Sequence, residues 1–279
     1  FVYILVFHYF PIYGIQIAFR NYKPSRGIWG SQWAGLKYFR KFLTSYNAWT
    51  IIRNTIVISL YQMLAFPVPI LLALVLHYTP ILRLKKITQS ITYAPHFIST
   101  VVLCGIITAF FSQSGIINQL GRILFGAQAV DYMSYPRYWR SLFVGSGIWQ
   151  NTGYNAIIYI AALAGVSSEL HEAAIMDGAN RVQRIWHIDI PSIMPTIIIL
   201  LIMQCGKVMN VGFQKAYLLQ NDLNTSVSEV ISTYVYKMGL NKGQYSLSTA
   251  VGLFNNVINF TLVILVNKAA NKLSGSGLW

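Results

Sequence analysis

The chain contains few acidic residues and few charged residues of any kind. Only 7 of its 279 residues are Asp or Glu, and charged residues make up 10% of the total, against about a quarter in a typical soluble domain. Apolar residues reach 55% and the mean hydropathy is +0.50, which excludes an ordinary soluble domain. Because the apolar runs are long and do not alternate with polar residues, the sequence predicts an all-α integral membrane protein.

Several kinds of chemistry are excluded by missing patterns. Cys104 and Cys205 lie far apart in apolar runs, so we expect no disulfide or cysteine–metal framework. No G-x-x-x-x-G-K-[ST] phosphate-binding loop occurs, since Gly206-Lys207 lacks the earlier glycine and the following hydroxyl residue. No Ser-His-Asp set, catalytic carboxylate pair or metal-ligand spacing is visible, and His96 has no second histidine at ligand spacing. We therefore expect no catalysis, no metal site, no cofactor in this chain and no nucleic-acid partner.

Long apolar segments are what the chain does have. A helix needs roughly 20 residues to cross the hydrocarbon core of a bilayer, and six segments come near that length: about 1–19, 53–77, 88–112, 141–165, 192–214 and 248–267. Pro67 and Pro69 in the second segment and Pro95 in the third remove backbone hydrogen bonds, so they predict kinks. We treat residues 1–279 as a single transmembrane domain.

A polar island, residues 166–191, interrupts the apolar segments and contains the stretch EAAIMDGANRVQRIWHIDIP. Ser168 is a suitable cap for a helix, and Gly178 can take the left-handed conformation that ends one. Asn180 can cap a second short helix, which Pro191 is expected to end. Four of the seven carboxylates of the protein belong to this island: Glu169, Glu172, Asp177 and Asp189.

The spacing within the island resembles the EAA loop of binding-protein-dependent ABC importer permeases. That pattern is Glu-Ala-Ala, three residues, Gly, nine residues and Ile-x-Leu-Pro; here Ile190 replaces the leucine. The resemblance implies a type I ABC importer permease fold with six transmembrane helices in the bacterial cytoplasmic (inner) membrane. It also implies that loop 166–191 is a cytoplasmic coupling helix that docks on an ATPase subunit, through Glu172, Ala173, Ala174, Asp177, Gly178, Ile188 and Pro191.

Other stretches, among them GLKYFRKF, ITYAPHFIS, IWQNTGYNAIIYIAAL and TYVYKMGL, are similar to the carbohydrate-uptake branch of this family. ITYAPHFIS and TYVYKMGL look most like the subgroup that imports complex oligo- and polysaccharides, including polyuronates such as alginate. The resemblance implies four kinds of partner: a second homologous permease, two ATPase subunits that bind ATP and Mg, an extracytoplasmic solute-binding protein and a saccharide. The alternatives are a permease for neutral oligosaccharides or, further off, for peptides or amino acids.

The distribution of basic residues conflicts with this topology. If loop 166–191 is cytoplasmic, thirteen Lys and Arg lie in or beside the outer segments 20–52, 113–140 and 215–247, and only seven lie inside. This reverses the usual excess of positive charge inside. One interpretation is a positive field that attracts an acidic saccharide or an acidic rim on the binding protein. The other is that Lys and Arg anchor the chain beside lipid headgroups.

Polar residues inside the predicted spans are candidates for a substrate pathway. Lys207 lies within the fifth span, where a cation is costly unless it faces water, a partner or a ligand. Gln204 and Asn210 lie three residues to either side, so one helical face is expected to carry all three. The fourth span adds Gln150, Asn151 and Asn155. The alternatives are a snorkelling lysine and amides that only join membrane helices.

The segment 31–48 predicts an amphipathic helix on the membrane surface. Four apolar residues recur there at helical spacing, and three basic residues lie beside them: Leu36, Phe39, Leu43 and Tyr46, with Lys37, Arg40 and Lys41.

A secondary transporter driven by an ion gradient would need intramembrane acids for coupling, and no predicted span contains one. A membrane enzyme or scaffold without a pathway is disfavoured by the EAA loop.

Overall fold

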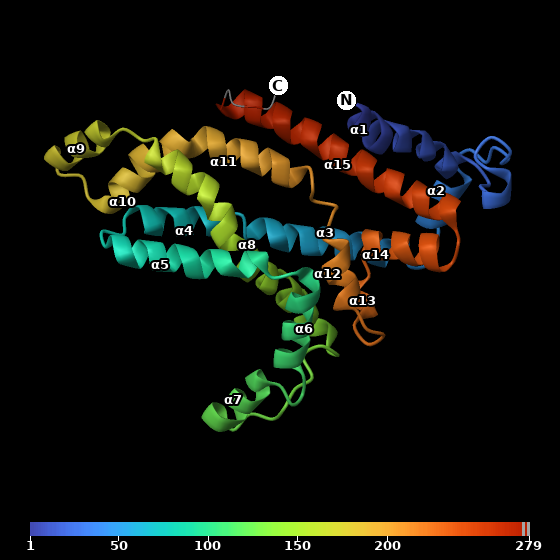
Figure 1. Ribbon diagram of the computed structural model, residues 1–279, viewed down its shortest axis with the longest axis horizontal. Helices are drawn as coiled ribbons and strands as arrows, with labels where there is room; N and C mark the ends of the chain where they lie inside the picture. The colour runs from blue at the N-terminus through green and yellow to red at the C-terminus, as the bar shows by residue number, and fades with distance from the viewer. Residues whose placement is uncertain (275–276, 278–279) are drawn as a thin grey trace.

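The computed structural model describes residues 1–274 and residue 277 of the 279-residue chain. The described part is helical and contains no strand beyond two isolated bridges. Figure 1 shows α3, α4, α5, α11 and α15 running roughly along one direction, with α8 crossing them obliquely and with α6 and α7 projecting away from the bundle. The short helices α9 and α10 stand at one end of it, near the end of α4.

The helices follow one another with short connections. Up to residue 97 they are α1 (Val2–Ile4), the π-helix η1 (Leu5–Tyr9), the 3₁₀-helices η2 (Phe10–Phe19) and η3 (Pro24–Arg26), α2 (Lys37–Leu43), α3 (Ala48–Leu64), α4 (Pro67–His77), α5 (Leu82–Tyr93) and the 3₁₀-helix η4 (Ala94–Phe97). The next are α6 (Thr100–Phe111), α7 (Ile116–Phe125), α8 (Pro136–Ala164), α9 (Ser168–Met176), α10 (Arg181–Arg184), the π-helix η5 (Ile185–Asp189) and α11 (Ile190–Cys205). The last are α12 (Phe213–Leu218), α13 (Thr225–Ser228), α14 (Ile231–Tyr236), the π-helix η6 (Lys237–Asn241) and α15 (Tyr245–Ser274).

Within the described residues, five helical stretches are long and apolar enough to cross a membrane. They are Val2–Phe19, Ala48–His77, Thr100–Phe125, Arg181–Cys205 and Tyr245–Lys272. Four of them overlap the predicted first, second, fifth and sixth spans. The predicted fourth span, 141–165, lies within α8, whose 29 residues are long enough to cross a bilayer although this helix is not among the five apolar ones.

The predicted third span, 88–112, is wrong as one continuous helix. The chain leaves the α-helical conformation at Ala94–Phe97 and bends at Ile98 and Ser99, both of which have extended backbone. Ser99 then caps α6 by accepting a 3.3 Å hydrogen bond from the Val102 amide, and Gln150 of α8 donates 2.9 Å to the Ile98 carbonyl. The kink expected from Pro95 is therefore a break between α5 and α6, and the side chains of Ser99 and Gln150 hydrogen-bond backbone groups at that break.

The break expected from proline in the second span is confirmed between α3 and α4. Helix α3 ends at Leu64, and Pro67 occupies the first turn of α4, where its missing N–H costs nothing.

The fifth span ends earlier than predicted, at Cys205 and not at 214. A Cβ on Gly206 would come within 2.7 Å of Val263 Cγ2, and Gly212 has φ +79°, so residues 206–212 form a close-packed turn against α15.

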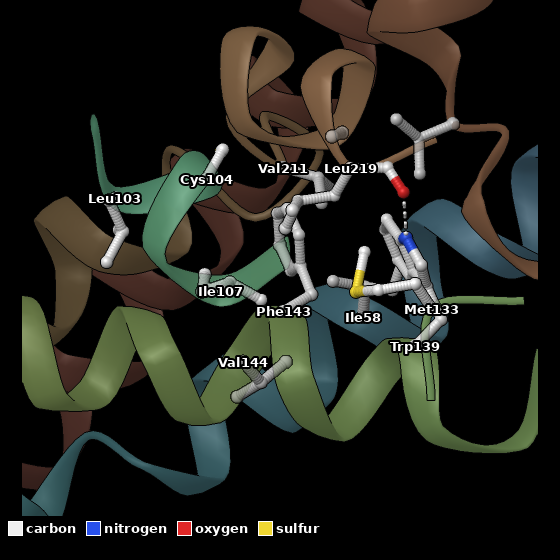
Figure 2. Close-up of a cluster of buried hydrophobic side chains, with 12 residues drawn as sticks. Ile58, Leu103, Cys104, Ile107, Met133, Trp139, Phe143, Val144, Val211 and Leu219 are labelled. Atoms are coloured by element: carbon white, nitrogen blue, oxygen red, sulfur yellow. Dashed lines mark hydrogen bonds between the residues drawn. The ribbon is translucent and has the colours of Figure 1, made fainter. Parts of the chain in front are cut away.

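Three hydrophobic clusters hold the helices together. The first, shown in Figure 2, joins α3, α6, α8 and α12, and the indole Nε1 of Trp139 within it donates a 3.0 Å hydrogen bond to the Leu219 carbonyl. The second joins α2, α3, α14 and α15, and the third joins α4, α8 and α11. Helix α8 contributes to the first and third clusters, so it links the α9 end of the bundle to its middle.

The expected amphipathic helix over 31–48 is only seven residues long in the structure, from Lys37 to Leu43. Its anchor is Phe42, which is buried and packs edge-to-face on Phe254 of α15, with ring centroids 6.0 Å apart. The predicted stripe is largely exposed, since Leu36, Leu43 and Tyr46 all face outward. The predicted surface helix requires such an exposed apolar face, whereas spacing alone does not reveal that Phe42 packs on another helix.

Candidate functional site

The helix α9 of the polar island is defined at both ends by hydrogen bonds. Ser167, not the predicted Ser168, is its N-cap, and its hydroxyl accepts a 3.2 Å bond from the Glu169 amide. At the other end the Ala179 amide donates 2.8 Å to the Ala174 carbonyl and the Gly178 amide donates 3.0 Å to the Ile175 carbonyl. This is a Schellman termination. The left-handed conformation predicted for Gly178 is confirmed, with φ +79°.

The second short helix of the island also begins as predicted and then differs. Asn180 and Gln183 form a reciprocal capping box with distances of 2.8 and 2.9 Å. Pro191, however, does not end this helix: α10, η5 and α11 follow one another from Arg181 to Cys205. The π-turn at Ile185–Asp189 shifts the hydrogen-bond register, so Pro191 occupies the first turn of α11, where its missing N–H is tolerated.

The predicted coupling residues lie on an accessible surface at the end of the bundle. Ala174 and Ile188 are half-buried, whereas the remaining five are exposed: Glu172, Ala173, Asp177, Gly178 and Pro191. Five large apolar side chains of the same segment are exposed as well, namely Leu170, Ile175, Met176, Val182 and Trp186. Exposed apolar side chains gathered in one short segment are typical of a surface that contacts another protein.

A polar cluster that the sequence interpretation missed fastens α9 to the spans. Asp189 is fully buried, and its Oδ2 accepts a 2.6 Å hydrogen bond from the Tyr78 hydroxyl at the end of α4. Its Oδ1 lies 3.2 Å from Nε2 of His171 on α9. Burial, followed by the contact with Asp189, raises the pKa of Tyr78 to about 12. No spacing rule finds this cluster, since the three residues come from distant parts of the chain.

His77 completes the cluster. One donor atom each from His77, His171 and Asp189 lies within 4.8 Å of the others. The sequence predicts no metal site, because no two of these residues stand at a ligand spacing within one segment. The fold nevertheless brings two imidazoles and one buried carboxylate together, the donor types that Zn²⁺ and related ions prefer.

A cavity of about 450 Å³ opens beside the break between α3 and α4. Walls from α8 and from the end of α11 complete it. Its polar lining residues are Gln62, Asn151, Thr152, Asn155, Gln204 and Lys207, with Phe66 and Tyr159 among the apolar ones. The proline-induced break thus creates the space, and three separate helices supply amides and one cation to it.

Four of the six predicted pathway residues share this cavity and two do not. Asn151, Asn155, Gln204 and Lys207 line it. Asn210 lies beyond the end of α11, where it accepts a 2.9 Å hydrogen bond from Asn255, so the expectation of one helical face for 204, 207 and 210 is wrong. Gln150 supports the α5–α6 bend through Ile98. The premature end of α11 separates Asn210 from the other two.

The thirteen basic residues assigned to the outer segments differ in exposure. Five donate to internal partners: Arg20 to the Ser31 carbonyl, Lys37 to Asn21, Arg140 to Asn54, Lys215 to the Phe143 carbonyl and Lys237 to Glu229. Nine are exposed: Lys23, Arg26, Lys37, Arg40, Lys41, Arg53, Arg122, Arg137 and Lys242. Most of the predicted positive charge therefore faces the surroundings.

Known proteins share this arrangement and sequence. The model of the binding-protein-dependent transport system inner membrane component family matches residues 50–274. The chain belongs to this family. Its members are ABC transporter permeases, so the protein is a non-catalytic, multi-pass subunit of an inner membrane importer, as the EAA loop predicted.

Individual relatives place this permease in the carbohydrate-uptake branch. It is 42% identical to protein LplB and 40% identical to the polygalacturonan/rhamnogalacturonan transport system permease YteP, both of Bacillus subtilis strain 168, with all of this chain and 88% and 87% of theirs covered. It is 34% identical to a chain of the bacterial alginate ABC transporter solved with an alginate pentasaccharide-bound periplasmic protein. That match has a TM-score of 0.92 and covers 99% of this chain and 93% of the other. The predicted type I permease fold is thus confirmed.

Proposed function

We propose that this permease forms half of the translocation pathway for an acidic oligo- or polysaccharide. The observation that carries the proposal is the cavity beside the α3–α4 break, where Lys207 is surrounded by amide side chains. Amides hydrogen-bond sugar hydroxyls, and an ammonium group offers a counter-charge for a carboxylate. Lys207 lies beyond the last residue of α11 and is exposed, so its ammonium group is free to meet a ligand in the cavity.

Two relatives support an acidic substrate. The solved transporter carries alginate and YteP is named for polygalacturonan, and both polymers are polyuronates. The nine exposed basic residues assigned to the outer face would raise the local concentration of such an anion. The competing interpretation, that these residues only anchor the chain at the lipid headgroups, predicts no preference for charge.

The assembly that we propose contains a second homologous permease, two ATPase subunits that bind ATP and Mg, and an extracytoplasmic solute-binding protein. Helix α9 with Glu172 and Gly178 would dock on an ATPase subunit, and closure of the ATPase pair would move it. The exposed apolar residues around it, such as Met176 and Trp186, fit a protein partner. The substrate and the binding protein shift the open–closed equilibrium only through their different affinities for the two states.

The test is ATP hydrolysis and uptake by the complete complex in liposomes, with binding protein loaded with either an oligouronate or a neutral oligosaccharide of the same length. We expect stimulation by the oligouronate, and we expect Lys207→Met to reduce uptake of the anionic sugar at least tenfold. The matched control is Lys268→Met, in α15 and outside the cavity. Stimulation only by the neutral sugar, or normal uronate uptake by Lys207→Met, would contradict the acidic assignment.

A further inference from the structure

We propose that His77, His171 and Asp189 bind a divalent transition-metal ion, with Zn²⁺ as the best match, and that this ion fastens α9 to the ends of α4 and α11. The three ligands come from three elements: His77 is the last residue of α4, His171 belongs to α9 and Asp189 ends η5. The inference concerns the base of α9 and does not depend on which substrate the permease carries.

The distances suit a four-coordinate ion. With bonds of about 2.0–2.1 Å, tetrahedral zinc places its ligand atoms about 3.3 Å apart. His171 Nε2 and Asp189 Oδ1 are 3.2 Å apart, and the donor atom of His77 lies within 4.8 Å of both. His77 is half-buried at a helix end, so we expect rotation of its side chain to close the remaining gap. The fourth position is left for water.

His171 Nε2 and Asp189 Oδ1 are both buried and lie 3.2 Å apart, at ion-pair distance, but neither forms an aligned hydrogen bond with the other or with another described residue. Buried polar atoms are almost always hydrogen-bonded. An ion coordinated by both atoms would satisfy them at this separation.

The neighbouring residues orient the ligands and restrict the kind of ion. The Tyr78 hydroxyl holds Asp189 Oδ2 at 2.6 Å, which directs Oδ1 toward the histidines, as outer hydrogen bonds do for metal-bound carboxylates. Lys85 acts electrostatically on His77, and the guanidinium of Arg184 lies 5.6 Å from the centroid of the Tyr78 ring. These positive charges oppose any divalent cation, so the choice of ion rests on the donor atoms: two imidazoles favour Zn²⁺, Ni²⁺ or Co²⁺ over Mg²⁺ and Ca²⁺, which prefer oxygen ligands.

A bound ion would change how α9 moves. His171 immediately precedes Glu172, the first residue of the coupling pattern, and the ion would tie this turn of α9 to two spans at once. A displacement of α9 would then move the ends of α4 and α11 with it, because the ion would leave no flexible connection between these elements. Without the ion, His171 and Asp189 would be joined only by an ion pair that depends on protonation of the histidine.

The experiment measures metal in the assembled complex, purified without a polyhistidine tag and dialysed against micromolar Zn²⁺. We compare wild type with His77→Ala and His171→Ala by elemental mass spectrometry, and with Co²⁺ as a spectroscopic probe whose visible absorption reports the ligand geometry. The matched control is His187→Ala, also in η5 but exposed, with Nδ1 2.9 Å from the Gln183 carbonyl. Metal on the partner subunits is the same in every sample, so the difference belongs to this site.

We expect one Zn²⁺ per chain above the level of the His77→Ala His171→Ala double variant, and we expect His187→Ala to match wild type. Affinity should fall at least tenfold in each single variant and 10- to 100-fold in Tyr78→Phe. Equal metal content in wild type and the double variant would overturn the proposal and leave a protonation-dependent ion pair. If His171→Ala fails to assemble, His77→Ala and its Co²⁺ spectrum decide the question, because His77 is only half-buried.

Discussion

The hydroxyl of Tyr78 donates a 2.6 Å hydrogen bond to the buried carboxylate of Asp189, across 111 residues of sequence. Tyr78 follows the last residue of α4, and Asp189 immediately precedes α11. The bond therefore joins the ends of two membrane spans at the point where the coupling helix α9 meets them. Removing it leaves a buried carboxylate oxygen without a donor.

Tyr78→Phe is expected to lower the free energy of unfolding by about 1–3 kcal/mol, the cost of an unsatisfied buried acceptor. The measurement is the melting temperature of the purified complex in detergent, with a chelator present so that metal does not contribute. Tyr46→Phe is the control, since Tyr46 is almost fully exposed. An equal, small change in both variants would show that the bond adds nothing to stability.

Gly178→Val is expected to uncouple ATP hydrolysis from transport. Its φ of +79° costs a residue with a Cβ about 1–2 kcal/mol, so the Schellman end of α9 would reshape. We expect substrate-stimulated ATPase activity of the reconstituted complex to fall at least fivefold. Gly243→Val is the control, because Gly243 has φ +63° and open space around it, like Gly178, but lies beside α15. Intact stimulation in Gly178→Val would remove the coupling role.

Gly153→Ala is expected to separate α5 from α8. A Cβ at this position would overlap the backbone carbonyl of Thr92, which cannot move aside as a flexible side chain would. Overpacking of this kind costs about 1–3 kcal/mol. Gly145→Ala on the same helix meets nothing within 4 Å and should leave the melting temperature unchanged or slightly raised. Similar melting temperatures for both variants would mean that the helices do not approach so closely.

The burial of Lys215 is expected to make the free energy of unfolding depend on pH. Burial lowers its pKa from 10.5 to about 8, so between these values the unfolded state binds more protons than the folded state. Stability should therefore rise as pH increases from 8 to 10.5 and be lost as pH falls back toward 8. The effect is at most about 3 kcal/mol. Lys215→Met should remove this rise in unfolding measurements, and a wild-type slope retained in the variant would contradict the assignment.

Gln204 and Gln150 were both predicted to line the pathway, and the structure assigns them different tasks. Gln204→Leu is expected to reduce saccharide uptake severalfold at unchanged melting temperature, since this residue lines the cavity. Gln150→Leu should instead lower the melting temperature, because its amide holds the Ile98 carbonyl at the α5–α6 bend. Uptake assays and thermal unfolding on the same preparations separate the two effects, and the reverse pattern would refute the distinction.

Short-range patterns were sufficient for much of the fold and for the coupling loop. Gly178 and Asn180 have the conformation and cap that their positions predicted, because helix ends are governed by hydrogen bonds within a few residues. The break before Pro67 follows from the missing N–H of proline. The errors occurred where distant packing decides, at the bend at Ile98 and at the early end of α11. Each depends on a contact with another helix, as does the burial of Phe42, which no sequence pattern indicated.

Composition and local spacing by themselves determined that this chain is an all-helical membrane protein with two capped short helices in the island 166–191, because hydropathy and capping act over lengths of one helix or less. The resemblance of that island to the EAA loop added its expected role in coupling. Only the tertiary structure decided which polar residues share a cavity and which merely join helices. It alone brought together His77, His171 and Asp189, since the positions of side chains from three separate elements depend on how those elements pack. Local propensities carry no information about that packing.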